Sequence, residues 1–216
     1  MRVLITAGVT REYIDDVRIL TNVSSGKLGA RIADEFIAED HEVVFIHSST
    51  SVLPMSRFHV SYIKADSVQD VFKAMKESIM DVDIVVHCMA VSDYYFETDK
   101  PVKVHGSDVK AFADFINANA RVSPKIISYV KEWNPNVSLV GFKFTVGKTI
   151  EDLVSIAKDS CIRNGCDIVV ANDKIQMKEA KVHLAYFVKP DGSYEPFYGK
   201  NQIAKGLVKR AGSVLE

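Results

Sequence analysis

The chain has 216 residues, 47% of them hydrophobic and 25% charged, and its formal net charge is -1. This balance fits a globular domain with a full core, and it gives no electrostatic basis for a nucleic-acid or membrane partner. No window approaches the roughly 20 apolar residues of a membrane helix, and the apolar N-terminal run is too short for a signal peptide.

The cysteines and histidines suggest no metal or disulfide framework. Cys88, Cys161 and Cys166 form no C-x-x-C pair, and the six histidines lack metal-ligand spacing. An odd number of scattered cysteines is typical of free thiols in a reducing compartment. We therefore expect a cytoplasmic protein in which these side chains are structural.

The first half of the chain alternates short apolar runs with amphipathic stretches. Strands are predicted over residues 2–6, 42–46, 59–63 and 83–88. Helices are predicted over 27–40 and 67–79, where apolar residues recur at helical spacing. The run 83–88 is apolar almost throughout, which is typical of a strand covered on both faces.

The second half continues this alternation after an irregular segment. Residues 94–121 are predicted to form a flap or dimerisation excursion with a short helix over 108–117. Further strands are predicted over 138–144 and 167–171, and helices over 123–133, 149–163 and 200–215, with Pro124 in the first turn of its helix. Residues 182–188 and 194–197 flank a turn-rich segment and predict an antiparallel hairpin.

This order of elements predicts an α/β fold in one domain spanning residues 1–216. We expect a Rossmann-like, doubly wound, mostly parallel sheet with a C-terminal antiparallel hairpin addition. In such sheets ligands bind beyond the carboxyl ends of the strands, where the strand order reverses. The residues that follow each predicted strand are therefore the candidate site residues.

The first candidate is Ser24-Ser25-Gly26-Lys27, which opens the first predicted helix. Backbone N–H groups at a helix start attract anions, and hydroxyls, glycine and lysine strengthen such a site. The same serines are also candidates for ordinary helix caps. The composition leaves both interpretations open, a phosphate site and a capped helix with a solvated lysine.

Neither of two common nucleotide motifs is present in this region. Thr21 and Leu28 stand where the Walker phosphate loop requires Gly and then Ser or Thr. Gly8 stands alone after the first strand, where the dinucleotide fingerprint requires three glycines.

Three later strand ends carry candidate residues with two interpretations each. Asp93 is placed to bind Mg²⁺ or a ribose hydroxyl, or to cap a turn. Phe142, which follows Gly141, offers a flat face to a base or packs in the core. Asn172 and Asp173 either bind a ligand or form a turn.

Six segments, taken together and in this order, resemble the phosphopantothenate–cysteine ligase family, the phosphopantothenoylcysteine synthetases. They are 5–12 (ITAGVTRE), 17–22 (VRILTN), 24–29 (SSGKLG), 90–94 (AVSDY), 141–143 (GFK) and 170–173 (VAND), and they extend over most of the chain. Many bacterial members carry a fused decarboxylase domain, for which this length leaves no room. We therefore expect the stand-alone bacterial form.

The resemblance implies a two-step ligase reaction in coenzyme A biosynthesis. The carboxylate of 4′-phosphopantothenate attacks the α-phosphate of CTP, which releases pyrophosphate and gives an acyl-cytidylate. The amine of L-cysteine then attacks the activated carbonyl, which releases CMP and forms the amide. Mg²⁺ and cationic side chains offset the charge of these reactants. The family also implies a homodimer, with no nucleic-acid or membrane partner.

The resemblance further implies a role for individual residues. The catalytic residues are Asn22, Lys103 and Arg18. The residues assigned to 4′-phosphopantothenate are Gly8, Thr10, Ser24, Ser25 and Gly26. The residues assigned to the nucleotide are Ala90, Asp93, Pro124, Lys125, Ile126, Ile127, Phe142, Asn172 and Asp173, with Asp93 also the candidate Mg²⁺ ligand.

The sequence departs from the family pattern at three places. Val9 replaces the second glycine of the usual Gly-Gly-Thr turn. Lys103 lies in a segment that only faintly resembles the lysine-rich catalytic segment, so Lys110 is the alternative. Ser160 and Asn164 stand where many relatives have two nucleotide-binding lysines, which leaves both CTP and ATP open.

Two other functions are alternatives to the ligase. A short-chain reductase or epimerase requires a glycine-rich first loop and a Tyr-x-x-x-Lys pair, and the sequence has neither. A non-catalytic nucleotide-binding regulator would keep Gly8 and the serine segment, and it is favoured if Lys103 has no catalytic role.

Overall fold

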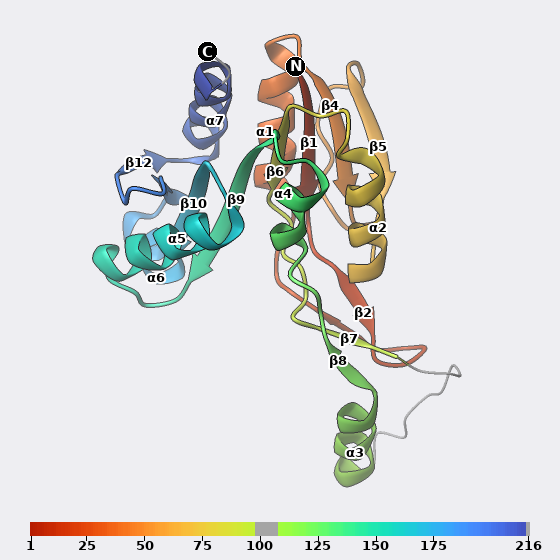
Figure 1. The fold of residues 1–216 in the computed structure, drawn as a ribbon. Helices are drawn as coiled ribbons and strands as arrows, with labels where there is room; N and C mark the ends of the chain where they lie inside the picture. The colour runs from red at the N-terminus through yellow and green to blue at the C-terminus, as the bar shows by residue number, and fades with distance from the viewer. Residues whose placement is uncertain (98–107, 215–216) are drawn as a thin grey trace.

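The computed structural model describes residues 1–97 and 108–214, so the segment that contains Lys103 lies outside the described residues (Figure 1). Eight strands form one sheet. In spatial order they are β12 (Tyr194–Tyr198), β11 (Leu184–Val188), β10 (Ile168–Asp173), β9 (Ser138–Thr145), β6 (Ile84–His87), β1 (Arg2–Ala7), β4 (Glu42–His47) and β5 (Val60–Lys64).

The strand order confirms the predicted doubly wound sheet. β1 pairs in parallel with β4 on one side and with β6 on the other, so the chain order reverses between β1 and β6. β11 pairs antiparallel with both β10 and β12, which confirms the C-terminal hairpin. The carboxyl ends of β1, β4, β6, β9 and β10 consequently meet along one edge of the sheet.

Helices cover both faces of the sheet. α1 (Lys27–Ala38) and α7 (Lys200–Val214) pack on one face. α2 (Val68–Ser78), α5 (Ile150–Asn164) and a 3₁₀ turn, η1 (Ile126–Tyr129), which runs into α4 (Val130–Trp133), pack on the other. α6 (Lys174–Ala180) follows β10 directly. No helix of the described residues combines the length and the apolar character needed to cross a bilayer.

Local sequence explains where the predicted helices begin and end. Ser67 and Asp70 form a reciprocal capping box at the start of α2. Thr149 caps α5 by accepting a hydrogen bond from the Asp152 N–H, and Gly165 ends this helix in the left-handed conformation, with φ of 64°. These caps fall within a few residues of the predicted boundaries.

The N-terminal part of the 123–133 helix prediction was wrong. The segment becomes helical only at Ile126, as η1, so Pro124 precedes the helix and does not lie in its first turn. The backbone N–H of Ser123 donates to the Asp93 carbonyl at 2.9 Å, which holds this residue beside the β6 loop. Pro124 also disfavours helical geometry in the residue that precedes it, which is Ser123.

Five short elements beyond the carboxyl edge form what we call the arm. They are β2 (Arg11–Tyr13), β3 (Ile19–Thr21), β7 (Tyr94–Phe96), β8 (Ala120–Val122) and α3 (Val109–Asn119). β2 pairs with β3 and β7 with β8, and β2 lies beside β7. The arm projects away from the sheet (Figure 1). The 108–117 prediction matches α3, whereas the four strands were not predicted.

Candidate functional site

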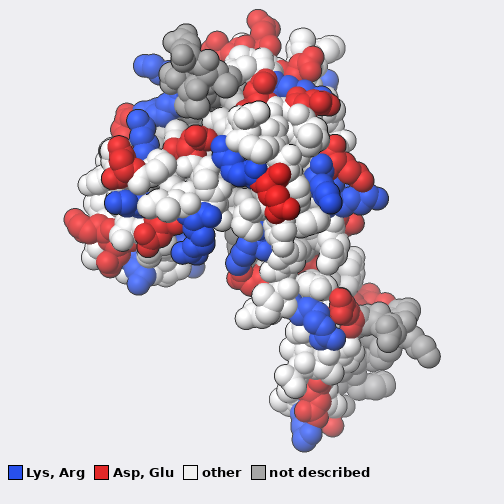
Figure 2. All heavy atoms as spheres, in the orientation of Figure 1, with Lys and Arg blue, Asp and Glu red and all other residues white. Residues whose placement is uncertain are grey.

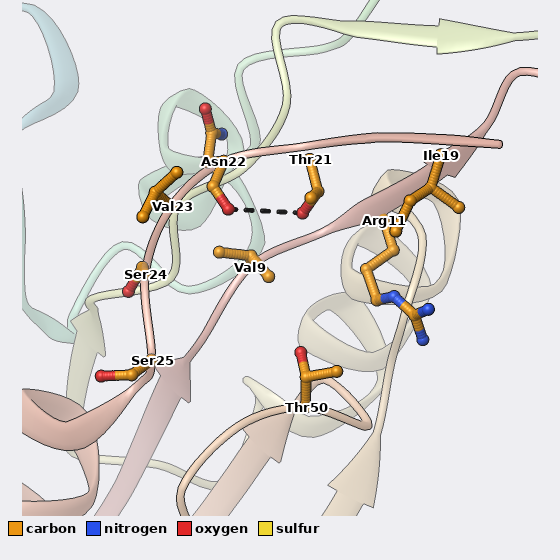
Figure 3. A pocket seen from close by; sticks show the side chains of 9 residues that line it. All are labelled: Val9, Arg11, Ile19, Thr21, Asn22, Val23, Ser24, Ser25 and Thr50. Carbon is orange, nitrogen blue, oxygen red and sulfur yellow. Dashed lines mark hydrogen bonds between the residues drawn. The ribbon is translucent and has the colours of Figure 1, made fainter.

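A cavity of about 420 Å³ opens beside the carboxyl ends of β1 and β4 (Figure 3). Its walls come from the loops after these strands, from the β2–β3 hairpin and from the segment before α1. The lining residues are Val9, Arg11, Ile19, Thr21, Asn22, Val23, Ser24, Ser25 and Thr50. The structure thus brings together Asn22, Ser24 and Ser25, which were predicted from the sequence.

Gly8 directly precedes Val9, which lines the cavity, and is not itself a lining residue. Its φ of 96° favours glycine, and a Cβ atom here would lie 1.7 Å from the Ser51 hydroxyl oxygen. The Ser51 hydroxyl donates to the Ala7 carbonyl at 3.0 Å. Gly8 is therefore required so that the loop after β4 can close onto the end of β1.

Val9 adopts a backbone conformation that does not require glycine. It is buried, with 4% of its surface exposed, and it is absent from the described non-glycine residues with positive φ. Its backbone forms a parallel bridge with Ala90. The departure from the usual Gly-Gly-Thr turn therefore leaves the pairing of the β1 and β6 loops intact.

The N-terminus of α1 carries no side-chain cap. Gly26 is the N-cap residue, with φ of 72°, and the start of the helix has no side-chain cap hydrogen bond. Of the two interpretations left open for Ser24 and Ser25, the structure does not show the ordinary helix cap, because both residues lie before the N-cap and line the cavity. Backbone N–H groups at an uncapped helix start are available to an anion.

Asn22 connects the cavity to the loop that follows β6. Its side-chain Nδ2 donates to the carbonyls of Ala90 at 3.4 Å and Val91 at 3.2 Å. The Ala90 carbonyl also accepts from the Thr10 N–H at 3.2 Å. Asn22 thereby places the segment that begins at Ala90 against the cavity wall.

Thr10 supports this arrangement from within the core. Its side chain is fully buried, and its hydroxyl accepts from the Ser92 N–H at 2.8 Å and bonds with the Glu12 carboxylate. Thr10 does not line the cavity, although the resemblance assigned it to the phosphopantothenate. In the described structure it fixes the course of the loop after β6.

His87, at the end of β6, is a buried polar residue for which the sequence predicted a structural role. Its Nδ1 lies 2.9 Å from the Thr6 hydroxyl oxygen, which also accepts from the Met89 N–H at 3.2 Å. Burial lowers the pKa of His87 to about 4, so the ring is neutral near pH 7. Through Thr6, the neutral ring fixes the start of the loop that follows β6.

Asp93 and Lys125 form an exposed ion pair at the other end of this loop. The Lys125 Nζ lies 2.5 Å from Asp93 Oδ1. The side chains of Ile126 and Ile127 pack into the core, so Lys125 is the charged member of the predicted 124–127 segment that reaches solvent. The described residues contain no group of three or more His, Cys, Asp or Glu side chains that could hold a metal ion.

The cysteines do not add a nucleophile to the site. All three are free thiols. Burial raises the pKa of the Cys88 thiol to about 12, which keeps it protonated near neutral pH.

The remaining predicted nucleotide residues lie farther along the same edge and outside the lining of the cavity. Phe142 is partly buried and packs against the core on the α1 face. Asn172 is buried and its Nδ2 lies 3.3 Å from the Met177 sulfur.

Asp173 is held by several donors at the end of β10. Burial by itself raises its pKa, and hydrogen bonds from the Lys148 N–H, the Thr145 hydroxyl and the N–H groups of Ile175 and Gln176 outweigh this effect and lower the pKa to about 2. Its carboxylate therefore caps α6 and orders the loop after β9.

Arg18 lies in the arm and does not line the cavity. Its guanidinium forms an ion pair with Asp15, and its Cζ lies 4.8 Å from the centroid of the Phe112 ring in α3. Lys110, the alternative to Lys103, is exposed on α3 and pairs with Asp114 at 2.6 Å.

Sequence reasoning missed three polar residues of the cavity, Arg11, Thr21 and Thr50. Arg11 lies within the quoted 5–12 segment and received no role, because the strand that turns its side chain away from the buried Glu12 is only three residues long. Thr50 belongs to a serine-rich loop after β4, and the composition of this loop is typical of an ordinary turn. The sequence holds no local signal that this loop folds toward residues 22–25.

The chain resembles known proteins over most of its length. A family model described as the DNA/pantothenate metabolism flavoprotein C-terminal domain matches residues 1–214. The coenzyme A biosynthesis bifunctional protein CoaBC of Thermococcus kodakarensis is 39% identical over 173 residues, which cover 79% of this chain and 41% of that protein. The protein of the same name from Haemophilus influenzae is 33% identical over 178 residues, which cover 80% and 41% of the two chains.

Solved structures show the same fold across the whole chain. The DNA/pantothenate metabolism flavoprotein from Streptococcus pneumoniae has a TM-score of 0.85 and 31% identity, with 99% of both chains covered. A C-terminal domain of CoaBC has a TM-score of 0.76 and 26% identity, with 99% of this chain and 95% of that chain covered. The chain spans about two fifths of the length of the curated relatives given above. It belongs to the family of DNA/pantothenate metabolism flavoprotein C-terminal domains.

Proposed function

We propose that this chain is a phosphopantothenate–cysteine ligase that joins 4′-phosphopantothenate to L-cysteine through an acyl-nucleotide. The observation that carries the proposal is the contact of Asn22 with the carbonyls of Ala90 and Val91. This contact connects two parts of the site, which are the cavity, suited to an anion, and the loop that ends at Asp93. Membership of the family supports the same reaction.

The chemistry requires two anionic reactants to meet. A carboxylate oxygen of 4′-phosphopantothenate attacks the α-phosphorus of CTP, and pyrophosphate leaves. The cysteine nitrogen then attacks the acyl carbon, CMP leaves and the amine loses a proton. The uncapped start of α1 and the hydroxyls of Ser24 and Ser25 are suited to hold one phosphate group. Asn22 is placed to contact the acyl-nucleotide, and the resemblance gives Lys103 the role of stabilising the transition-state charge.

Mg²⁺ is the metal that this reaction implies. Mg²⁺ usually binds one or two protein carboxylates together with substrate phosphates, and it keeps several waters. The exposed carboxylate of Asp93 fits such a site, and the described residues contain no group of three or more His, Cys, Asp or Glu side chains that could hold the ion by themselves. The ion would supply charge neutralisation at the phosphates, while Lys125 orients the Asp93 side chain in the structure described here.

We also infer that the active form is a homodimer that pairs through the arm. Several apolar side chains of the arm are exposed, among them Tyr13, Val17, Tyr94, Val109 and Val122, with exposures between 51% and 83%. Figure 2 shows uncharged side chains over much of the visible face of the arm, with charged side chains of both signs near its junction with the body and at its tip. Sedimentation of the purified chain as a dimer supports this inference, and sedimentation as a monomer at assay concentration contradicts it.

The ligase is tested by incubating the purified chain with 4′-phosphopantothenate, Mg²⁺ and either CTP or ATP, with and without cysteine. Pyrophosphate and the nucleoside monophosphate are measured. CMP and an amide product that depend on cysteine support the proposal with CTP, and AMP assigns the enzyme to the ATP-using branch. A folded chain that releases no pyrophosphate with either nucleotide contradicts it and favours the non-catalytic regulator.

The free thiols support a reducing compartment such as the cytoplasm.

A further inference from the structure

Arg11 contributes a positive charge to the cavity and has no role in the reaction as proposed above. It is the first residue of β2, where it is partly buried and followed by the buried Glu12. Side chains alternate along a strand, so the side chain of Glu12 points to the N-terminus of α2 while that of Arg11 points to the cavity. Figure 3 shows the Arg11 side chain extending toward the loop that carries Thr50.

The backbone and the side chain of Arg11 are both fixed in place. Its N–H donates to the Asp66 carbonyl at 2.7 Å, and its strand register pairs it with Thr21. Its Nη1 donates to the Ser49 hydroxyl at 2.8 Å. The guanidinium is therefore held at the mouth of the cavity by the loop after β4.

The charge of Arg11 is not neutralised by the described residues. None of their ion pairs includes Arg11. The nearby Asp66 carboxylate instead accepts from the Ser49 N–H at 2.7 Å and pairs with Lys64 at 3.4 Å. Arg11 is the sole charged residue among those that line the cavity in the described structure.

The other lining residues complement this cation. Thr21, Ser24, Ser25 and Thr50 supply hydroxyls around the same cavity. The start of α1, which has no side-chain cap, follows directly after Ser25 and Gly26. A guanidinium, hydroxyls and an uncapped helix start together form the usual donor set for a phosphate group.

We infer that Arg11 binds a phosphate group of a substrate in this cavity, with the loop after β4 positioning its guanidinium. This inference rests on the proposed ligase, whose two phosphorylated substrates, 4′-phosphopantothenate and the nucleoside triphosphate, share this chemistry. Arg11 is a binding residue and not a group that takes part in bond making. Its loss therefore raises the KM of one substrate more than it lowers kcat.

The test compares Arg11→Gln and Arg11→Lys with the wild type while each phosphorylated substrate is varied in turn. We expect Arg11→Gln to raise one KM by about 10- to 100-fold, the range for a lost hydrogen bond to a charged group. The substrate whose KM rises is the one whose phosphate Arg11 holds. Arg11→Lys keeps the charge without the two-pronged donor geometry and should show a smaller increase.

A matched control uses another arginine, and a second readout does not depend on activity. Arg57→Gln removes the same charge at a guanidinium that lies 5.9 Å from the centroid of the Tyr62 ring and does not line the cavity. Its KM values should equal those of the wild type. Inorganic phosphate and pyrophosphate serve as probes in a thermal-shift titration, where both should stabilise the wild type and Arg57→Gln more than Arg11→Gln.

The outcomes separate this inference from the proposed function. If the wild type is active and Arg11→Gln keeps both KM values and the phosphate-dependent shift, the inference is wrong and the ligase stands. If the wild type is inactive with every nucleotide, the ligase is wrong and the thermal-shift comparison alone decides the inference. If Arg11→Gln does not fold, an unchanged KM in a folded Arg11→Lys variant overturns it.

Discussion

The buried carboxylate of Asp15 holds the guanidinium of Arg18. Asp15 Oδ2 accepts from Arg18 Nη2 at 2.5 Å and from Nε at 3.0 Å, while its Oδ1 accepts from the backbone N–H groups of Val17 and Arg18 at 3.0 and 2.8 Å. The Asp15 side chain has 0% exposure and that of Arg18 has 34%. One carboxylate thus shapes the β2–β3 turn and fixes the direction of the arginine.

The first prediction concerns this pair. In Asp15→Asn the side-chain oxygen can still accept from the two backbone N–H groups, but its amide group presents hydrogens to the guanidinium. We expect kcat/KM of the ligase reaction to fall by at least about 10-fold, because a hydrogen bond to a charged group is lost. The free energy of unfolding should fall by about 1–3 kcal/mol. Steady-state kinetics and urea unfolding of the same preparation measure both effects.

Arg18→Lys provides the matched comparison for Asp15→Asn. It keeps a positive charge beside Asp15 but loses the Nε and Nη2 donors that the carboxylate binds. If orientation of the guanidinium matters, both variants lose activity to a similar extent. Full activity in Asp15→Asn would show that Asp15 serves only the fold of the turn.

The second prediction concerns Asn22. Asn22→Ala removes the two bonds to the Ala90 and Val91 carbonyls and the proposed contact with the acyl-nucleotide. Because Asn22 is exposed, we expect less than about 1 kcal/mol of change in the free energy of unfolding. Formation of the amide should fall by at least about 10-fold, with a smaller effect on pyrophosphate release. Turnover equal to that of the wild type contradicts the role at the intermediate.

The third prediction decides between two lysines. Lys103→Gln should lower kcat by about 100-fold or more if this lysine stabilises charge in the transition state. Lys110→Gln is the matched control, because Lys110 is an exposed residue of α3 that pairs with Asp114. Rapid-quench measurement of pyrophosphate release reports the first chemical step. The reverse result, with loss of activity in Lys110→Gln alone, would transfer the catalytic role to Lys110.

The fourth prediction concerns Asp93 and its partner Lys125. Asp93→Asn should raise the concentrations of nucleotide and Mg²⁺ needed for half-maximal rate, because a carboxylate oxygen is the ligand that Mg²⁺ prefers. The Asp93 side chain is 69% exposed and that of Lys125 is 71% exposed, so their ion pair contributes little to stability. Unchanged requirements for both ligands in Asp93→Asn would assign this residue to the loop alone.

The sheet was predictable because its signals are local. The run from Arg2 to Ala7 is apolar at almost every position, and β1 is buried from its second residue onward. Periodicity on α1 likewise matches its buried face, which includes Ile32 and Phe36. Such patterns depend on burial alone, so the predicted strand and helix positions agree with the structure within a few residues for most elements.

The arm and the cavity were less predictable because non-local contacts create them. β2 and β3 are three residues each, too short for a periodic pattern. Arg11 faces the cavity because the Asp66 carbonyl and the Ser49 hydroxyl, more than 35 residues away, hold it there. Thr10 was assigned to a ligand from its motif, whereas its hydroxyl is bound by Ser92, 82 positions later. Contacts between residues so far apart in the sequence leave no local pattern from which they could be predicted.

The last prediction is a pH dependence of stability that arises from His87. Its pKa is lowered by burial to about 4, below the value of about 6.5 expected in the unfolded chain. The unfolded state therefore binds a proton between these values while the folded state does not. Stability is retained above pH 6.5 and is lost as the pH falls toward 4. The full difference corresponds to about 3 kcal/mol, of which about 2 kcal/mol is reached at pH 5.

His87→Asn isolates this contribution from that of the acidic residues. Asparagine keeps a polar atom near the position of Nδ1 and so retains a partner for the Thr6 hydroxyl. Urea unfolding at pH 7 and at pH 5 gives the loss of stability on acidification for each protein. We expect this loss to be smaller in His87→Asn by about 2 kcal/mol, even though the variant is less stable at pH 7. Equal losses in both proteins would mean that His87 is protonated in the folded state at pH 5, and that the loop at the end of β6 admits water to the ring.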